Sequence, residues 1–123
     1  MAAPLKGLKV LVVEDNYLIA TLIEQILITA GCIGLEPIPR LAQATEAARR
    51  GAFDAALLDV NLSGERVYPV AEILSDRNIP YLFMTGYSVE DLPAEYIERP
   101  KLRKPFKPEQ LLGALLNLVS VRV

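Results

Sequence analysis

Four short apolar runs of the chain are each followed by polar residues that could carry out chemistry. The run LKVLVV precedes Glu14 and Asp15, AALL precedes Asp59, YLFM precedes Thr85, and KLR precedes Lys104. If the runs are parallel strands, their ends meet at one edge of an open α/β sheet, where such folds bind ligands. We therefore expect carboxylates, a hydroxyl and an ammonium to converge in one crevice.

The three carboxylates favour a divalent metal. No arginine or histidine stands in the same motifs, and crowded like charges raise one another's pKa unless a cation joins them. All-oxygen ligation suits Mg²⁺ or Mn²⁺ better than zinc, and Mg²⁺ also accepts phosphate oxygens. Taken alone, Glu14 and Asp15 are equally consistent with a second interpretation, in which they only cap the helix that begins near Tyr17.

Lys104 and Thr85 favour a phosphoryl ligand at the same place. An ammonium can pair with one phosphoryl oxygen, and a hydroxyl can donate a hydrogen bond to another. Asp59 is then the candidate nucleophile, because aspartate can accept a phosphoryl group as an acyl phosphate. The protein mainly positions groups and neutralises charge in such a transfer, so a chain without histidine can perform it.

The elements that must position these residues alternate along the chain. Strands are expected at residues 8–13, 33–38, 55–59, 79–85 and 101–103, and helices at 17–29, 41–50, 67–77 and 108–119. The segment 86–100 is interrupted by Gly86, Pro93 and Pro100, so a fourth helix there should be short or irregular. This alternation predicts an α/β fold: a doubly wound, five-stranded parallel sheet with helices on both faces.

Composition limits the function classes. The chain has 123 residues, of which 52% are hydrophobic and 23% charged, which suits one globular domain. A formal net charge of −2 argues against nucleic-acid binding. The apolar runs are too short for a membrane span and no secretory signal is apparent, so we expect a cytoplasmic protein. The single cysteine, Cys32, should be a buried, inert thiol.

The ordered set ED, LLD, MTG and KPF resembles the receiver domain of two-component response regulators. The resemblance implies a flavodoxin-like fold with strand order 2-1-3-4-5, in one domain over residues 1–123 with its core at about 8–119 and no effector domain. It also implies phosphorylation of Asp59 by a histidine kinase or phosphotransfer protein, phosphoryl contacts from Thr85 and Lys104, and a cis peptide at Lys104–Pro105. Mg²⁺ would be held by Glu14, Asp15, Asp59 and the backbone carbonyl of Asn61.

One position departs from the receiver pattern. Three residues before Lys104, where receivers commonly carry an aromatic switch residue, this chain has Lys101. The stretches FMTGYS and LLDVNLSGE are similar to atypical stand-alone receivers that carry a Phe-Ala-Thr-Gly-Gly/Tyr-Tyr motif and often work with HWE-type histidine kinases. Tyr87 is the nearest candidate to replace the switch aromatic and act with Thr85, although ordinary loop packing would also explain it.

Several functions remain open within this resemblance. The domain could be a relay intermediate, a phosphate sink or a regulator that binds its target directly, and we expect a monomer. A pseudo-receiver that only binds protein is an alternative, although the intact site set argues against it. A Mg²⁺-dependent small-molecule phosphatase would need a second acid near Asp59, where Asn61 stands, and a lid. The basic residues around Lys104 are expected to form a solvated edge, or alternatively to meet an acidic partner.

Overall fold

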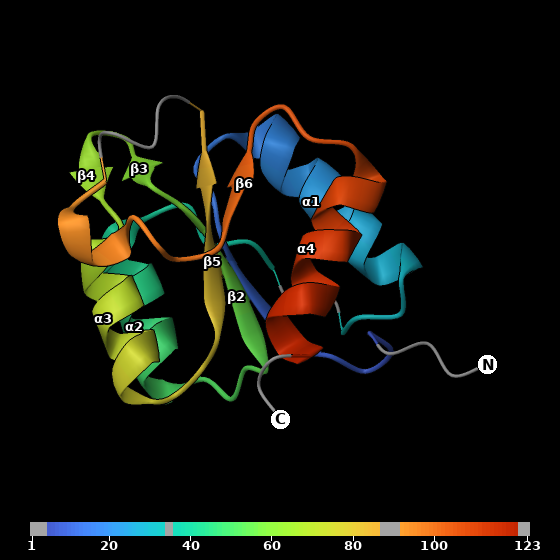
Figure 1. Ribbon diagram of the computed structural model, residues 1–123, viewed down its shortest axis with the longest axis horizontal. Coiled ribbons are helices and arrows are strands. Elements are labelled where there is room, and N and C mark those ends of the chain that lie inside the picture. The colour runs from blue at the N-terminus through green and yellow to red at the C-terminus, as the bar shows by residue number, and fades with distance from the viewer. Residues whose placement is uncertain (1–4, 34–35, 87–91, 121–123) are drawn as a thin grey trace.

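A computed structural model describes residues 5–33, 36–86 and 92–120 of the chain. Along the sequence, the elements in these ranges are β1 (Val10–Val13), α1 (Tyr17–Thr29), α2 (Leu41–Arg50), β2 (Ala55–Asp59), β3 (Asn61–Leu62), β4 (Glu65–Arg66), α3 (Tyr68–Asp76), β5 (Tyr81–Thr85), the 3₁₀ helix η2 (Ala94–Tyr96), β6 (Lys101–Arg103) and α4 (Pro108–Ser120). Figure 1 shows the sheet between two layers of helices.

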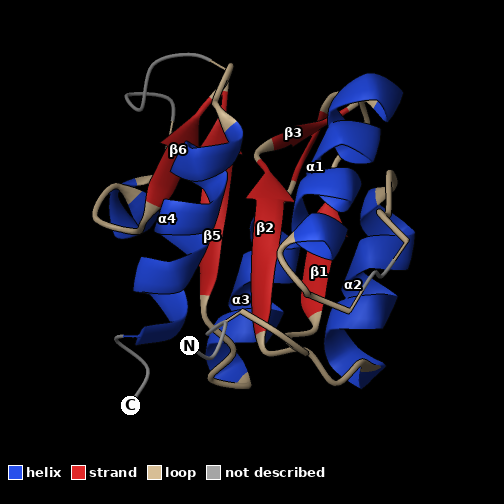
Figure 2. Ribbon diagram, turned by 90° about the vertical axis from the view of Figure 1, so that its right-hand side faces the viewer, coloured by secondary structure: helices blue, strands red, loops and turns tan. Residues whose placement is uncertain are grey.

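The main sheet is parallel and has the order β1-β2-β5-β6 in the described part of the chain. Helices α2 and α3 cover one face, and α1 and α4 cover the other (Figures 1 and 2). Alternate residues of each strand point to opposite faces. Leu58 and Phe83 therefore join the core under α2 and α3, whereas Leu57 and Met84 join the core under α1 and α4. The predicted doubly wound α/β fold is confirmed.

The strand predicted at residues 33–38 is reduced, in the described residues, to two isolated parallel bridges. Ile33 pairs with Lys9 and Ile38 pairs with Val13, which places this segment beside the outer edge of β1. The predicted order 2-1-3-4-5 is thereby kept. At Ile38 the N–H donates to the carbonyl of Val12 and the carbonyl accepts from the N–H of Glu14, so the flanking Pro37 and Pro39 lie at edge positions where no ladder donor is needed.

Other predicted boundaries differ little from the structure. The predicted ranges of α1, α2, β2 and β6 agree with the observed ones, whereas α3 ends at Asp76 and β5 begins at Tyr81. The irregular segment 86–100 contains only the short helix η2 in its described part, as expected. The antiparallel hairpin formed by β3 and β4 was not predicted. None of the helices in the described ranges is long and apolar enough to span a membrane.

Candidate functional site

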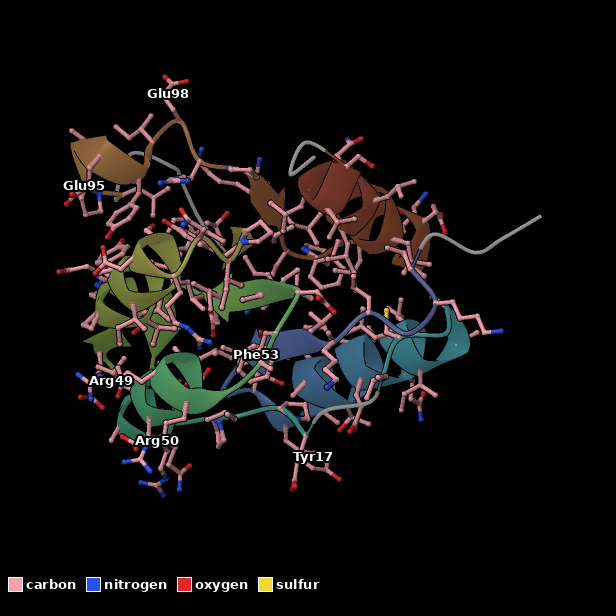
Figure 3. The ribbon with its side chains drawn as sticks, turned by 90° about the horizontal axis from the view of Figure 1, so that it is seen from below. Tyr17, Arg49, Arg50, Phe53, Glu95 and Glu98 are labelled. Atoms are coloured by element: carbon pink, nitrogen blue, oxygen red, sulfur yellow. The ribbon has the colours of Figure 1, made fainter. Side chains whose placement is uncertain are left out.

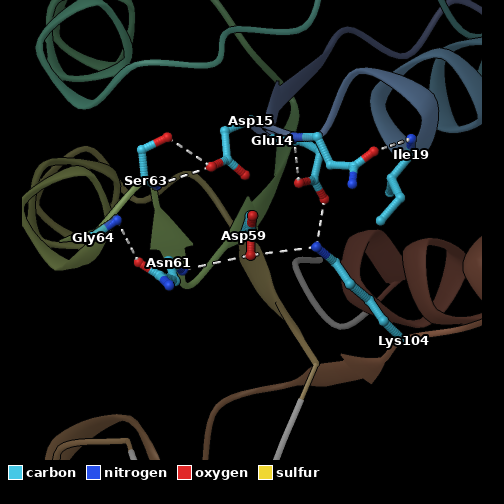
Figure 4. A network of polar contacts seen from close by, with 9 residues as sticks. Glu14, Asp15, Ile19, Asp59, Asn61, Ser63, Gly64 and Lys104 are labelled. Carbon is cyan, nitrogen blue, oxygen red and sulfur yellow. Dashed lines mark hydrogen bonds and ion pairs between the residues drawn. The ribbon is translucent and has the colours of Figure 1, made fainter.

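The three predicted carboxylates meet at the carboxyl end of the sheet. Glu14 and Asp15 follow β1 directly, and Asp59 is the last residue of β2. Each offers an oxygen that lies within 4.8 Å of the others, as the close-up in Figure 4 illustrates. They line a cavity of about 330 Å³ together with Thr85 and Lys104. All five residues that the strand-end argument selected therefore surround one space.

Lys104 supplies a positive charge to the lining of this cavity. Its Nζ lies 2.6 Å from Oε1 of Glu14 and 3.4 Å from Oδ1 of Asp59. The backbone N–H of Lys104 donates to the carbonyl of Thr85, which ties the end of β6 to the end of β5. The peptide bond between Lys104 and Pro105 is cis, the geometry that the resemblance implies.

Asp59 is electrostatically the most perturbed carboxyl group in the cluster. Its pKa is raised from 3.8 to about 8, first because it is buried, and then because Glu14 interacts with it through a hydrogen bond and through charge. The ammonium of Lys104 acts in the opposite direction but does not compensate. Without a further cation, this carboxyl group therefore holds a proton near neutral pH.

Asp15 is held in the opposite state. Burial acts to raise its pKa, but hydrogen bonds from the side chain of Ser63, from Asp59 and from the backbone of Ser63 outweigh burial and leave the pKa below its usual value. The backbone N–H and Oγ of Ser63 lie 2.8 Å and 3.0 Å from Oδ2 of Asp15. The Asp15 carboxyl group is therefore ionised, and its hydrogen bonds with Ser63 hold it in place.

Neither acid that follows β1 is the N-cap of α1. That role belongs to Asn16, whose side chain accepts a hydrogen bond from the N–H of Ile19 at 3.1 Å. Glu14 is buried and its Oε2 accepts a hydrogen bond from the N–H of Asn16. The interpretation that Glu14 and Asp15 only cap the helix is therefore wrong, and both acids are turned to the cavity instead.

The remaining predicted site residues divide into two groups. Asn61 lines the cavity together with Asp59, and Thr85 is a buried residue that also lines it. Lys101 is not among the residues that line the cavity, since its Nζ donates to the carbonyls of Ile97 and Arg99. Tyr87 lies outside the described residues, so its proposed part in a switch stays a prediction.

Sequence reasoning missed two residues at the cavity rim. Ser63 contacts Asp15, and Arg66 lies opposite Asn61 in the β3–β4 hairpin; both line the cavity. The signal that could have revealed them is the pair Ser63-Gly64, a two-residue turn between short strands that folds the chain back towards Asp59.

The donor set fits a hard divalent cation. The three clustered carboxylates are oxygen donors, the kind of ligand that Mg²⁺ and Mn²⁺ prefer. The ammonium of Lys104 can offset only one negative charge of the three acids, and the pKa of Asp59 is raised by burial first and then by Glu14. A divalent cation would remove the excess charge.

Residues 10–116 match the family model of the response regulator receiver domain. The chain belongs to the response regulator receiver family. This receiver is similar to the solution structure of SdrG from Sphingomonas melonis Fr1, with 38% identity, a TM-score of 0.82, and coverage of 97% of this chain and 99% of that one. The BeF3-activated conformation of SdrG from Pseudomonas melonis Fr1 has 37% identity, a TM-score of 0.77 and the same coverage.

A third solved structure bears on the metal. It is the receiver domain of the sensor histidine kinase PA1611 from Pseudomonas aeruginosa PAO1, with a magnesium ion coordinated in its active site cleft. The identity is 25% and the TM-score 0.76, over 93% of this receiver and 98% of that chain. No curated protein sequence matches this receiver. Its membership of the Phe-Ala-Thr-Gly-Gly/Tyr-Tyr subgroup stays a prediction.

Proposed function

We propose that this receiver accepts a phosphoryl group on Asp59, in a Mg²⁺-dependent reaction, from a histidine kinase or histidine phosphotransfer protein in the cytoplasm. The observation that carries the proposal is the place of Asp59, which is buried at the end of β2 between two further carboxylates and the ammonium of Lys104. The BeF3-activated form of the similar protein SdrG adds support.

The side chains suggest how the transfer proceeds. An oxygen of Asp59 attacks phosphorus, a new P–O bond forms, and the P–N bond to the donor imidazole breaks. Lys104 then exchanges its carboxylate partners for a phosphoryl oxygen, and the hydroxyl of Thr85 donates to another. Mg²⁺, held by Glu14, Asp15, Asp59 and the backbone carbonyl of Asn61, would neutralise charge on the phosphoryl oxygens.

The raised pKa of Asp59 supports a requirement for the cation. A protonated carboxyl group is a poor nucleophile, and Asp59 retains its proton up to about pH 8 when the three acids face only Lys104. A divalent cation beside the carboxylates favours the ionised form and so lowers this pKa. Metal binding therefore prepares the nucleophile as well as the phosphoryl group.

A protein donor is favoured by the surface next to the cavity. Tyr17, Leu18 and Leu22 of α1 are 80%, 77% and 46% exposed, and Tyr17 projects from the end of α1 in Figure 3. Of these three, Leu22 also lines an apolar hollow of about 390 Å³, together with Lys104, Pro105 and Phe106. Exposed apolar surface of this kind marks protein contacts, and a small phosphoryl donor would have no use for it.

Phosphorylation is expected to shift the conformational equilibrium only partly. Charge-assisted hydrogen bonds from Thr85 and Lys104 contribute about 1.5–3 kcal/mol each. Moving an equilibrium from 1:99 to 99:1 requires about 5.5 kcal/mol. Both bonds together reach that value only if no existing interaction is lost. Because Lys104 gives up its ion pairs with Glu14 and Asp59, the net stabilisation is smaller and the shift is partial.

The mass of the intact protein after incubation with acetyl phosphate tests the proposal. We expect a single phosphoryl adduct on the wild type in the presence of Mg²⁺, none after removal of Mg²⁺ by EDTA, and none on Asp59→Asn. The last variant keeps the size of the side chain and removes the nucleophilic carboxylate, so it separates the chemistry from the packing of β2.

Two results would contradict the proposal. An adduct on Asp59→Asn equal to that on the wild type would place the phosphoryl group on another residue. A wild type that stays unmodified by acetyl phosphate and also by a phosphorylated histidine phosphotransfer protein would leave Asp59 as a metal ligand or structural residue and favour the pseudo-receiver.

A further inference from the structure

The hairpin that follows Asp59 has a turn with an unusual backbone. Strands β3 and β4 pair Leu62 with Glu65, so Ser63 and Gly64 form a two-residue loop. Their φ angles are 53° and 92°, values typical of a type I′ turn, in which both central residues are left-handed. Asn61 reinforces the turn, because its Oδ1 accepts a hydrogen bond from the N–H of Gly64 at 3.0 Å.

Serine is not the residue that such a turn prefers. Glycine and asparagine adopt positive φ more readily, and another residue held there carries a conformational cost. The chain nevertheless has Ser63 at this position. Its backbone N–H and its hydroxyl both donate hydrogen bonds to Oδ2 of Asp15, at 2.8 Å and 3.0 Å. The turn thus presents two donors to a carboxylate that lies 48 residues away in the sequence.

This contact fixes the orientation of the Asp15 carboxylate. Ser63 donates both of its hydrogen bonds to Oδ2 of Asp15. Figure 4 shows the other carboxylate oxygen of Asp15 turned towards Asp59. Asp15, Glu14 and Asp59 each have an oxygen within 4.8 Å of the others in this arrangement. A carboxylate that is already oriented loses less side-chain freedom when a metal binds.

We propose that Ser63 is a positioning residue for Mg²⁺, which it serves by holding Asp15 through paired N–H and O–H hydrogen bonds. The inference rests on the proposed Mg²⁺-dependent function. Partners that orient metal ligands typically change metal affinity by about 10–100-fold when they are removed. Ser63 itself contacts neither the metal nor the phosphoryl group in this role.

Two substitutions at this position separate the hydroxyl from the turn. Ser63→Ala removes the hydroxyl and leaves a residue that is strained at positive φ. Ser63→Gly also removes the hydroxyl but relieves the strain and keeps the backbone N–H, so the hairpin should be at least as stable as in the wild type. Ser75→Ala is the matched control, because it removes a hydroxyl that contacts Tyr81 away from the cavity.

The test is a Mg²⁺ titration of the unphosphorylated proteins, followed by backbone amide NMR signals, with thermal unfolding in EDTA as the measure of stability. We expect both Ser63 variants to bind Mg²⁺ about 10-fold more weakly and Ser75→Ala to bind like the wild type. At saturating Mg²⁺, the rate of phosphorylation by acetyl phosphate should stay within about twofold of the wild-type rate.

Other outcomes overturn the inference in distinguishable ways. If the wild type binds Mg²⁺ and both Ser63 variants bind it equally well, Ser63 is only a turn residue and the proposed function stands. The same conclusion follows if Ser63→Ala binds weakly while Ser63→Gly binds normally, because turn strain then accounts for the loss. A wild type that fails to bind Mg²⁺ overturns both the positioning role and the proposed function.

Discussion

At the scale of single residues, the site depends on the ionisation of one carboxyl group. Burial and Glu14 raise the pKa of Asp59 from 3.8 to about 8, while hydrogen bonds from Ser63 help to hold the pKa of Asp15 low. Two neighbouring aspartates are thus kept in different protonation states by their surroundings. Asp59 is the group whose charge depends on what else binds in the cavity.

A dependence of stability on pH follows for the metal-free protein. Because the folded state holds the proton of Asp59 more tightly than the unfolded chain does, this group makes folding less favourable as pH rises from about 3.8 to about 8. Asp59→Asn cannot ionise, so it should be more stable than the wild type at pH 8 by about 1 kcal/mol or more, since one pKa unit corresponds to about 1.4 kcal/mol.

Urea unfolding in EDTA at several pH values measures this difference. The advantage of Asp59→Asn should shrink as the pH is lowered towards 4, where both proteins carry a neutral group, and Mg²⁺ should reduce it at pH 8 by binding the wild type. An advantage that is equal at pH 4 and pH 8 would contradict the raised pKa of Asp59.

At the scale of elements, α1 has two separate tasks. Ala20, Ile23, Ile26 and Leu27 pack it on the sheet, while Leu18 lies 77% exposed at the end next to the cavity. An exposed leucine adds little to folding, so it can be replaced without loss of the fold. The helix can therefore be tested as a docking surface without disturbing its role in the core.

Leu18→Glu should weaken phosphotransfer from a protein donor. We expect the rate of transfer from a phosphorylated histidine phosphotransfer protein to fall about tenfold or more, because a charge replaces an apolar contact. Phosphorylation by acetyl phosphate, followed by intact mass, should be unchanged. Ile28 is also exposed on α1 but lies ten residues further along, roughly 15 Å from Leu18, so Ile28→Glu is the matched control. Equal transfer rates for the three proteins would exclude docking at Leu18.

At the scale of the whole molecule, one hydrophobic core lies on each face of the sheet, and the cavity lies at the carboxyl end of the strands. Cys32 belongs to the core under α1 and α4, just before the bridge between Ile33 and Lys9. The bridge lies next to the start of β1, whereas the cavity lies beyond its end. Cys32 is buried, and burial raises the pKa of its thiol. The reactivity of the thiol can therefore report on opening of this core, far from the site.

The thiol should therefore react slowly in the native protein. Buried thiols are protonated and shielded, and only the exposed thiolate attacks. At pH 8 we expect a thiol reagent to label native Cys32 at least about 100-fold more slowly than in the urea-unfolded chain, with a rate that rises as urea approaches the unfolding midpoint. Equally fast labelling of native and unfolded protein would show that this core opens freely.

The sequence by itself determined the elements whose signals are local. The periodicity of residues 17–29 and the continuous apolar run at 55–59 identify a helix packed on one face and a strand buried on both, and both agree with the structure. It also determined the meeting of Asp59, Thr85 and Lys104, because parallel strands deliver their carboxyl ends to one edge. The signal at residues 33–38 was weaker, and the described part of that segment forms only two isolated bridges.

Only the tertiary structure decided which groups touch within the site. The contact from Ser63 to Asp15 joins residues 48 positions apart and depends on a left-handed backbone at Ser63. Asn16, and neither acid, caps the N-terminus of α1. Lys101 donates hydrogen bonds to the carbonyls of Ile97 and Arg99. Periodicity specifies which face of an element is buried. Hydrogen bonds between loops depend instead on backbone angles and on distances between segments remote in sequence, which no local pattern encodes.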